Sequence, residues 1–535
     1  MMYATQNCMI EWSYNSGKSY KDSFNDVELD VVFTDSEGKE KIVPAFWSGG
    51  NVWRVRYASE KVGTQHYRTL CSDTENSSLH GQEGVLEVTP YDGDNPLLKH
   101  GHLRISENRR YFEHLDGTPF FWLGDTWWMG LCKRLRWPGE FQLLTADRVS
   151  KGFTVIQIVA GLYPDMPPFD HRGANEAGYP WKEDYSRINP NYFDMADLRI
   201  NWLVQSGLVP CIVGCWGYFI DFAGVEVMKK HWRYLLARYG AFPVVWCMAG
   251  EATMLYYLST ARSSQTKFQE AIAKTRADWT EVTRYLRSID PYHHPITLHP
   301  SDCARNMVDD PALIDFDMLQ TGHGGQDSMP NTVRRVIDSV AGIPKMPVIN
   351  GEVCYEGILG QSWQNIQRIA FWTCVLSGAA GHTYGANGIW QVNTREKPFG
   401  PSPHGMSWGD TPWDEACKLA GSAQVGVGKR LLERYRWWEF EQHPEWAEPH
   451  ATPENYRLAY AAGIPRSVRF FFLPTHSALT FVKEIEKDVS YQAFYVDPKN
   501  GNEIDLGKVI PDAEGKWQPP KPPIFSDWIL VMESN

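Results

Sequence analysis

From about residue 100 to residue 440, apolar strand-like runs alternate with amphipathic helical stretches, and this alternation restricts the fold more than any other feature of the chain. It predicts eight strands, at 119–123, 153–159, 209–213, 244–248, 296–299, 316–320, 348–350 and 381–384. Predicted helices lie between them, at 193–205, 225–239, 266–288, 332–340 and 365–376. A doubly wound sheet would usually carry a glycine-rich phosphate loop after its first strand, and the sequence has none. The pattern therefore predicts an α/β fold in the form of a closed (β/α)₈ barrel, the TIM barrel.

Two β-rich segments flank the predicted barrel. Before it, apolar and polar side chains alternate in short runs separated by turn clusters, at 8–14, 27–33, 52–57 and 84–88. After it, short apolar runs lie at 468–473, 491–496 and 528–532. We therefore predict three domains: an N-terminal β-sandwich over 1–97, the catalytic barrel over 98–440 and a small C-terminal β-sandwich over 441–535.

The charge and the hydropathy pattern restrict the partners of the chain. A net charge of −12 argues against a nucleic-acid-binding surface and against binding to anionic membranes. No stretch of about 18 apolar residues is present, so we expect no membrane span. The N-terminus shows no basic start followed by an apolar core and a cleavage site, and we therefore expect a cytoplasmic protein. The sequence is compatible with a homo-oligomer but does not establish one.

The ten cysteines are scattered, and most lie inside apolar runs where a reduced thiol behaves as a small core residue. Cys211 and Cys215 have the spacing closest to a ligand pair, but no second pair stands near them. We therefore expect no structural zinc site.

Two glutamates stand where predicted strands end. Glu251 follows the fourth predicted strand and Glu352 follows the seventh. In a TIM barrel every strand delivers its C-terminal end to the same face, so the two carboxyl groups can meet across one cleft. A pair about 5–5.5 Å apart can act as nucleophile and general acid/base of a retaining glycosidase. A helix cap or a structural ion pair is the alternative for either residue.

The aromatic share of 13%, with 23 Trp and 25 Tyr, is compatible with carbohydrate binding, because sugar rings stack on aromatic faces. Most of these side chains must still be ordinary core. The best candidates for substrate contact follow predicted strands; they are Trp127, Trp216, Tyr384, Asn387 and Trp390. For each tryptophan, core packing is the competing interpretation.

Further polar residues fall near the predicted strand ends. Asp125 could bind a sugar hydroxyl or cap the following helix. His299, His323 and His382 would surround the same mouth and could contact substrate or Glu352. Three imidazoles could also hold a metal ion, but a catalytic zinc would compete with the carboxylate pair for the same chemistry. We therefore expect neither a metal nor an organic cofactor.

Two further features near the predicted mouth of the barrel have roles that the sequence does not assign uniquely. Glu356 is an alternative nucleophile, although its position beyond the strand end favours a supporting role. The long segment 161–189 follows the second predicted strand and is expected to form a wall of the pocket, because long loops on this face are usually functional.

Five motifs together resemble one known family. They are Gly124-Asp-Thr-Trp-Trp, Ile188-Asn-Pro-Asn-Tyr-Phe, Gly250-Glu251, Gly351-Glu-Val-Cys-Tyr-Glu-Gly and Gly381-His-Thr-Tyr-Gly-Ala-Asn-Gly-Ile-Trp. They look like domain-of-unknown-function family 4038, which includes glycoside hydrolase family 140, the apiosidases that act on branched pectin. The flanking segments are similar to the N-terminal and C-terminal β-domains of that family, so the resemblance covers nearly the whole chain.

The resemblance implies a retaining enzyme related to clan A, with Glu251 as acid/base and Glu352 as nucleophile. The chain departs from the family pattern at two positions. Gly250 stands where clan A enzymes typically carry Asn, and the apiosidases carry Asp where this chain has Glu251.

We therefore expect a retaining glycoside hydrolase that removes a terminal sugar from a small plant or pectic-type oligosaccharide or glycoside. An endo-acting β-glycanase is the alternative among glycosidases. A non-catalytic carbohydrate-binding protein is the alternative outside enzymes, and a metal-dependent barrel hydrolase is a third possibility.

Overall fold

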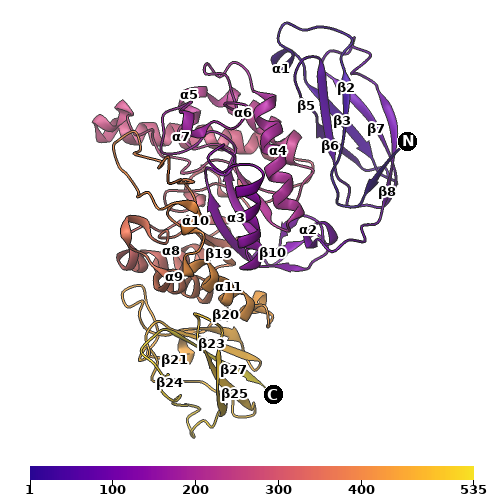
Figure 1. Ribbon diagram of the computed structural model, residues 1–535. Helices are drawn as coiled ribbons and strands as arrows, with labels where there is room; N and C mark the ends of the chain where they lie inside the picture. The colour runs from indigo at the N-terminus through magenta and orange to yellow at the C-terminus, as the bar shows by residue number, and fades with distance from the viewer. Residues whose placement is uncertain (535) are drawn as a thin grey trace.

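The computed structural model describes residues 1–534, and Figure 1 shows three parts in chain order. An N-terminal pair of β-sheets, drawn in indigo, precedes the barrel with its surrounding helices. A C-terminal pair of β-sheets, drawn in yellow, follows the barrel at the opposite side of the molecule. The ten cysteines are free thiols, nine of them buried. Within residues 1–534, no helix combines the length and the apolar character needed to cross a bilayer.

The N-terminal part contains a five-stranded and a three-stranded sheet packed face to face. The first has the order β1 (Met2–Thr5), β8 (Glu83–Thr89), β7 (Gly63–Cys71), β3 (Leu29–Thr34) and β4 (Glu40–Pro44). The second has the order β2 (Ile10–Asn15), β6 (Val52–Tyr57) and β5 (Phe46–Trp47). Phe33 of one sheet stacks on Tyr57 of the other, with ring centroids 3.6 Å apart. The short helices α1 (Ser23–Asp26) and α2 (Pro96–Lys99) complete this part.

The central part is a barrel of eight strands whose ladders are all parallel. The strands are β12 (Trp122–Trp127), β13 (Val155–Val159), β14 (Val209–Val213), β15 (Val245–Cys247), β16 (Ile296–Thr297), β17 (Asp317–Gln320), β18 (Val348–Glu352) and β19 (Gly381–Tyr384). Their order is β16-β15-β14-β13-β12-β19-β18-β17. The two end strands meet through single contacts, among them the bond from the Asp315 amide to the Ile296 carbonyl at 2.8 Å. The predicted TIM barrel is confirmed.

Helices surround the strands (Figure 1). They are α3 (Gly139–Ser150), α4 (Pro190–Gln205), α5 (Phe219–Ala223), α6 (Val225–Tyr239), α7 (Gln265–Ile289), α8 (Met329–Ala341), α9 (Gln364–Leu376), α10 (Trp413–Ala416) and α11 (Ala420–Leu432). All five predicted helices are present, as α4 and α6 to α9. The helices α3 and α11 were not predicted, because polar and small residues interrupt their apolar faces.

The first predicted strand, 119–123, needs a correction. Its first half is β11 (Pro119–Phe120), which pairs with β10 (Phe112–His114) and, through it, with β9 (Leu103–Ile105) in a separate small sheet. The barrel strand begins only at Trp122. Phe112 of the small sheet packs against Trp122 and Phe316, at 5.3 and 5.0 Å between ring centroids, at the N-terminal ends of their strands. Aromatic side chains therefore close this end of the barrel and leave the opposite end for a site.

The C-terminal part is attached to helix α9 of the barrel. Its larger sheet has the order β20 (Glu441–Gln442), β22 (Tyr460–Ile464), β23 (Val468–Leu473), β27 (Trp528–Ser534), β25 (Tyr491–Val496) and β26 (Glu503–Lys508). A second sheet pairs β21 (Ala447–Glu448) with β24 (Phe481–Val482). Arg368 of α9 binds Asp527 with two hydrogen bonds, of 2.6 and 2.8 Å, and both side chains are buried. This bidentate pair fixes the orientation of the sheet on the barrel.

Candidate active site

A cavity of about 330 Å³ opens at the C-terminal ends of the barrel strands and contains both predicted carboxyl groups. Glu352 is the last residue of β18. Glu251 follows β15 by a few residues and adopts a left-handed backbone conformation, with φ of 41°. Such a conformation is costly for a residue with a side chain and persists where the surrounding structure imposes it.

One amide connects the two carboxyl groups. The Nε2 atom of Gln320, at the end of β17, donates to Glu251 Oε1 at 3.1 Å and to Glu352 Oε1 at 3.0 Å. Two oxygens that share one donor at these distances cannot be more than about 6.1 Å apart. This limit lies below the separation of about 6.5–9.5 Å that inverting glycosidases need for a water molecule.

Glu352 is held as a carboxylate. Its side chain accepts a hydrogen bond from Tyr355 Oη at 2.6 Å and one from His323 Nε2 at 2.9 Å, and His299 Nε2 lies 3.2 Å from Oε2. Burial would raise the pKa of Glu352, but the hydrogen bonds and charge of the two histidines hold it below its ordinary value. An ionised carboxylate at this place is a competent nucleophile.

Glu251 is held as a carboxylic acid below about pH 7. Burial and, second, the negative charge of Glu352 raise the pKa of Glu251 from 4.5 to about 7. Its Oε2 accepts a hydrogen bond from Trp216 Nε1 at 3.3 Å. Two carboxyl groups with pKa values driven apart by their surroundings are the arrangement that assigns one to acid catalysis and the other to nucleophilic attack.

The structure explains why Gly250 precedes Glu251. A Cβ atom at Gly250 would lie 2.2 Å from the ring of Trp216. The indole ring therefore fills the space that a larger side chain would need, and its Nε1 atom binds the Glu251 carboxyl group. In this chain, tight packing of Trp216 on the backbone excludes the Asn that clan A enzymes typically carry.

Aromatic side chains form much of the cavity wall. They are Trp128, Trp216, Tyr257, Tyr355, Trp390 and Trp408. Tyr355 stacks against Trp390 at 6.0 Å and against His323 at 4.9 Å between ring centroids. Trp128 donates from Nε1 to Tyr355 Oη at 3.0 Å and thereby positions the hydroxyl group that binds Glu352. Flat apolar walls with a few oriented polar groups suit a sugar ring.

Four of the predicted substrate-binding residues lie at this cavity or contact its carboxylates. Trp216, His323 and Trp390 line the cavity. His299 lies beneath Glu352, fully buried, with its ring edge against Trp128 at 5.1 Å. Its position next to Oε2 makes it a neighbour of the carboxylate rather than a wall of the pocket.

Asp125 and Trp127 do not line the cavity, and their predicted contact with substrate is corrected. Both side chains are fully buried. Asp125 Oδ2 binds Arg148 Nε of helix α3 at 2.5 Å and accepts from Trp127 Nε1 at 2.7 Å. Successive side chains of a strand point to opposite sides, so β12 directs Trp127 toward Phe141 of α3 and the next residue, Trp128, into the cavity.

Three residues near β19, predicted to contact substrate, also lie outside the cavity. His382 is buried against Phe371, and Asn387 is buried beside the loop at Gly409. Tyr384 donates to Glu356 Oε2 at 2.6 Å. The other oxygen of Glu356 accepts from the Gly421 amide at 3.0 Å, and the side chain is fully buried. Glu356 therefore connects the segment after β18 to β19 and α11, and it does not compete with Glu352 for a substrate.

Sequence reasoning missed several residues of the cavity. Gln320 could have been found, because it ends the sixth predicted strand as Glu352 ends the seventh, and the two are paired in register. Asp165 lies in the predicted wall segment 161–189, where no local pattern distinguishes it. Tyr257 and Trp408 come from loops after β15 and β19 whose path only the tertiary structure shows.

The cavity does not present the donor set of a metal centre. Within residues 1–534, no group of three or more His, Cys, Asp or Glu side chains has a geometry suited to a metal ion. The histidines that could have formed one are used otherwise, since His299 and His323 contact Glu352 and His382 lies in the core.

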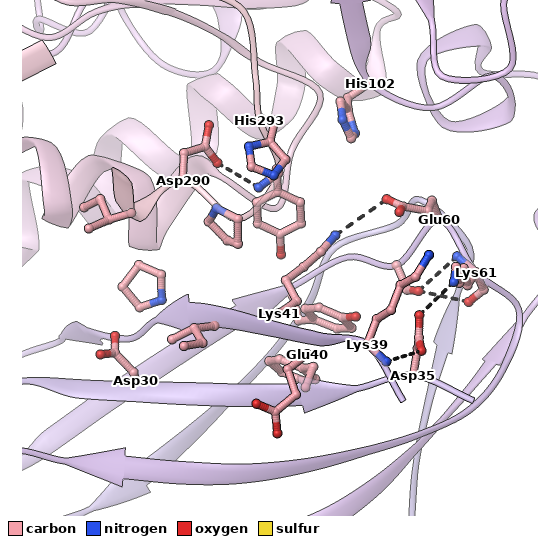
Figure 2. Close-up of a pocket in the computed structure, with 18 of the residues that line it drawn as sticks. Asp30, Asp35, Lys39, Glu40, Lys41, Glu60, Lys61, His102, Asp290 and His293 are labelled. Carbon is pink, nitrogen blue, oxygen red and sulfur yellow. Dashed lines mark hydrogen bonds and ion pairs between the residues drawn. The ribbon is translucent and has the colours of Figure 1, made fainter. Parts of the chain in front are cut away.

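A larger cleft of about 750 Å³ lies at the other end of the barrel, between the N-terminal sheet and the turn at Asp290 that precedes β16 (Figure 2). Its charged groups pair with one another: Lys61 with Asp35 at 2.8 Å, and Lys41 with Glu60 at 3.6 Å. The cleft therefore has the character of a domain interface whose lysines are paired with carboxylates.

Comparison with known proteins supports the catalytic assignment of the barrel. A family model described as the apiosidase-like catalytic domain matches residues 106–439, more than half of the chain. A model of a domain of unknown function, DUF5060, matches residues 5–72 in the N-terminal sheets. No curated protein matches the sequence at a significant level.

Several solved structures share the architecture. One described as a glycoside hydrolase is 23% identical, with a TM-score of 0.67, and the match covers 83% of this chain and 98% of that one. A structure described as a glycoside hydrolase from Bacteroides vulgatus ATCC 8482 is 17% identical, with a TM-score of 0.72 and complete coverage of both chains. A family 5 glycoside hydrolase from the same organism is 22% identical, with a TM-score of 0.66, covering 82% of this chain and 94% of that one. At these identities the similarity shows the fold.

Proposed function

This chain belongs to the apiosidase-like family of glycoside hydrolases, and we propose that it removes a terminal sugar from a small plant or pectic-type oligosaccharide or glycoside by a retaining double displacement. The observation that supports the mechanism is the shared donor Gln320, which keeps the bonded oxygens of Glu251 and Glu352 closer together than the carboxyl groups of inverting enzymes.

In the first step, Glu352 attacks the anomeric carbon while Glu251 donates its proton to the leaving oxygen. The glycosidic C–O bond breaks, and a covalent ester joins the sugar to Glu352. The nearby histidines favour the ionised form of Glu352 before the attack, and burial favours the protonated form of Glu251.

In the second step, Glu251 acts as a base toward water, which attacks the same carbon and releases Glu352. Once Glu352 is esterified, its negative charge no longer raises the pKa of Glu251. The pKa of Glu251 therefore falls in the intermediate, which makes the carboxylate form available when a base is needed. Two displacements at one carbon retain the anomeric configuration.

The cavity favours removal of a terminal unit over cleavage within a long chain. Its volume of about 330 Å³ is at the small end of ligand sites. Segments after β13, β15 and β19 contribute to its wall. The candidates for the terminal unit include apiose, because the family resemblance indicates it, and other neutral sugars of plant glycans.

The test is sugar release from a panel of aryl glycosides, plant glycosides and pectic oligosaccharides, including apiose-bearing ones. Wild type, Glu352→Gln and Glu356→Gln are compared. We expect release by the wild type, loss of about 10⁴-fold or more in Glu352→Gln, and activity close to wild type in Glu356→Gln.

The stereochemistry is read by NMR from the anomer that forms first. An inverted anomer would overturn the double displacement, and full turnover by Glu352→Gln would overturn the nucleophile. Cleavage only within long chains would favour the endo-acting β-glycanase. Binding of panel sugars without release by any variant would favour the non-catalytic carbohydrate-binding protein.

A further inference from the structure

A third carboxyl group faces the catalytic cavity, and the two displacement steps do not use it. Asp165 lies in the segment after β13, at a left-handed backbone conformation with φ of 58°. It lines the same cavity as Glu251 and Glu352. A residue with a side chain is costly at such φ, so the surrounding structure must impose this position.

Two loops hold one oxygen of Asp165. Its Oδ1 accepts hydrogen bonds from Ser402 Oγ at 2.6 Å, Tyr257 Oη at 3.0 Å and Trp408 Nε1 at 3.4 Å. The backbone N–H of Asp165 in turn donates to Tyr257 Oη at 3.1 Å. The side chain is therefore fixed in one orientation by the segments that follow β15 and β19.

The second oxygen is free. Among residues 1–534, none makes a hydrogen bond to Oδ2 of Asp165, and none forms an ion pair with this carboxyl group. Burial raises the pKa of Asp165, and the bonds from Ser402 and Tyr257 counteract this only in part. An asparagine could accept the same three hydrogen bonds without the desolvation cost of a charge, so packing alone does not account for an aspartate.

The free oxygen determines what kind of group can complete the site. A carboxylate oxygen accepts hydrogen bonds, and sugar hydroxyl groups donate them. A uronate carboxylate placed directly against this oxygen would be repelled by the ionised Asp165. Tyr257 stacks on His404 with ring centroids 4.9 Å apart, which adds an aromatic surface beside the carboxyl group.

We propose that Asp165 is a substrate-recognition residue whose free oxygen accepts a hydrogen bond from one hydroxyl group of a neutral sugar bound against Glu251 and Glu352. The proposal rests on the proposed glycosidase function and narrows its substrate class to sugars that are uncharged at this subsite. Because Ser402 and Trp408 bind the other oxygen, the same residue connects the substrate to the 385–412 segment of the wall.

The test compares wild type, Asp165→Asn, Asp165→Ala and Asp184→Asn. Asp184 lies in the same 161–189 segment, but its side chain is exposed, away from the cavity, and binds the Ser186 amide, so it provides the matched control. The substrates are the 4-nitrophenyl glycoside of the sugar that the wild type releases and its monodeoxy analogues. Thermal unfolding of each variant is measured beside the kinetics.

We expect Asp165→Asn to lower kcat/KM on the parent glycoside by about 10-fold and Asp165→Ala by about 100-fold, mainly through KM, as for loss of a charge-assisted hydrogen bond. On one monodeoxy analogue, the wild type and both variants should have similar kcat/KM values, because the group that Asp165 binds is missing. Asp184→Asn should match the wild type on every substrate.

Two results would overturn the proposal. One is unchanged kcat/KM in both Asp165 variants. The other is an equal loss on all analogues with a lower unfolding temperature, which would indicate a structural role. If the wild type releases no sugar from any substrate, the proposed glycosidase function is refuted. Calorimetric titration of wild type and variants with the corresponding free monosaccharides then tests whether Asp165 recognises sugar. Weaker binding to the Asp165 variants supports recognition, and absence of binding to the wild type refutes it.

Discussion

Replacing Glu251 by Gln should stabilise the fold at alkaline pH and not at acid pH. The pKa of Glu251 is raised from 4.5 to about 7 in the folded protein, first by burial and then by Glu352. Below pH 4.5 both the folded and the unfolded chain hold the proton, so the group has no effect on stability. Between pH 4.5 and 7 only the unfolded chain ionises, so stability falls as pH rises, and the full cost is present above pH 7.

The magnitude follows from the two pKa values. At 1.36 kcal/mol per pKa unit, the cost above pH 7 is on the order of 3 kcal/mol. With about 2.1 cal/mol/K of unfolding entropy per residue, this corresponds to about 4 °C for a barrel of the matched length, residues 106–439. Glutamine does not ionise and avoids this cost. The glutamine side chain also disturbs the hydrogen bonds that Trp216 and Gln320 donate to residue 251. That loss of stability is the same at each pH, so it does not change the difference between the two pH values.

The assay is differential scanning calorimetry of wild type and Glu251→Gln at pH 4.5 and pH 8. The expected result is that the unfolding temperature of the variant, relative to wild type, is about 4 °C higher at pH 8 than at pH 4.5. Glu107→Gln, at an exposed glutamate, serves as the control. The same temperature difference at both pH values would refute a buried, protonated Glu251, whatever the sign of that difference.

Three further results are expected. The activity of the wild type should fall as pH rises through about 7, because Glu251 must be protonated to assist the leaving group; a pH profile of kcat/KM that stays flat to pH 9 would contradict this. Tyr355→Phe should lower kcat/KM by about 10- to 100-fold, since it removes the 2.6 Å hydrogen bond to Glu352, and an unchanged value in steady-state assays would argue against that role. Asp125→Asn should destabilise the fold by about 1–3 kcal/mol, because Arg148 loses its fully buried carboxylate partner and keeps only Asp147. KM should be unchanged for the properly folded protein, and a raised KM without destabilisation would restore Asp125 to the substrate site.

The eight strands could be predicted because most of them are short apolar runs buried on both faces, a pattern that is present in the local sequence. The strands at 209–213 and 381–384 have the predicted bounds. The first strand was misplaced because Pro119 and Phe120 have the same apolar character as the barrel strand. Their pairing with the β10 strand depends on residues that the local pattern does not include.

Side-chain direction was harder to predict than position along a strand. Trp127 and Trp128 are adjacent and chemically identical, and only the pleat of β12 decides which one faces the cavity. Asp125 had two interpretations in the sequence. The structure shows a third role, a buried ion pair with Arg148. Arg148 lies 23 residues later in the chain, on helix α3, which packs against the strand that carries Asp125.

The sequence by itself determined the barrel and the two glutamates at strand ends, because periodicity and strand termination are local properties of the chain. The tertiary structure decided what surrounds those glutamates. The amide of Gln320 between them, the histidines on Glu352 and the wall around Asp165 come from separate loops that meet only when the barrel closes. Charge, burial and hydrogen bonding act through distance in space, so the opposite pKa shifts of these two similar side chains depend on the folded structure.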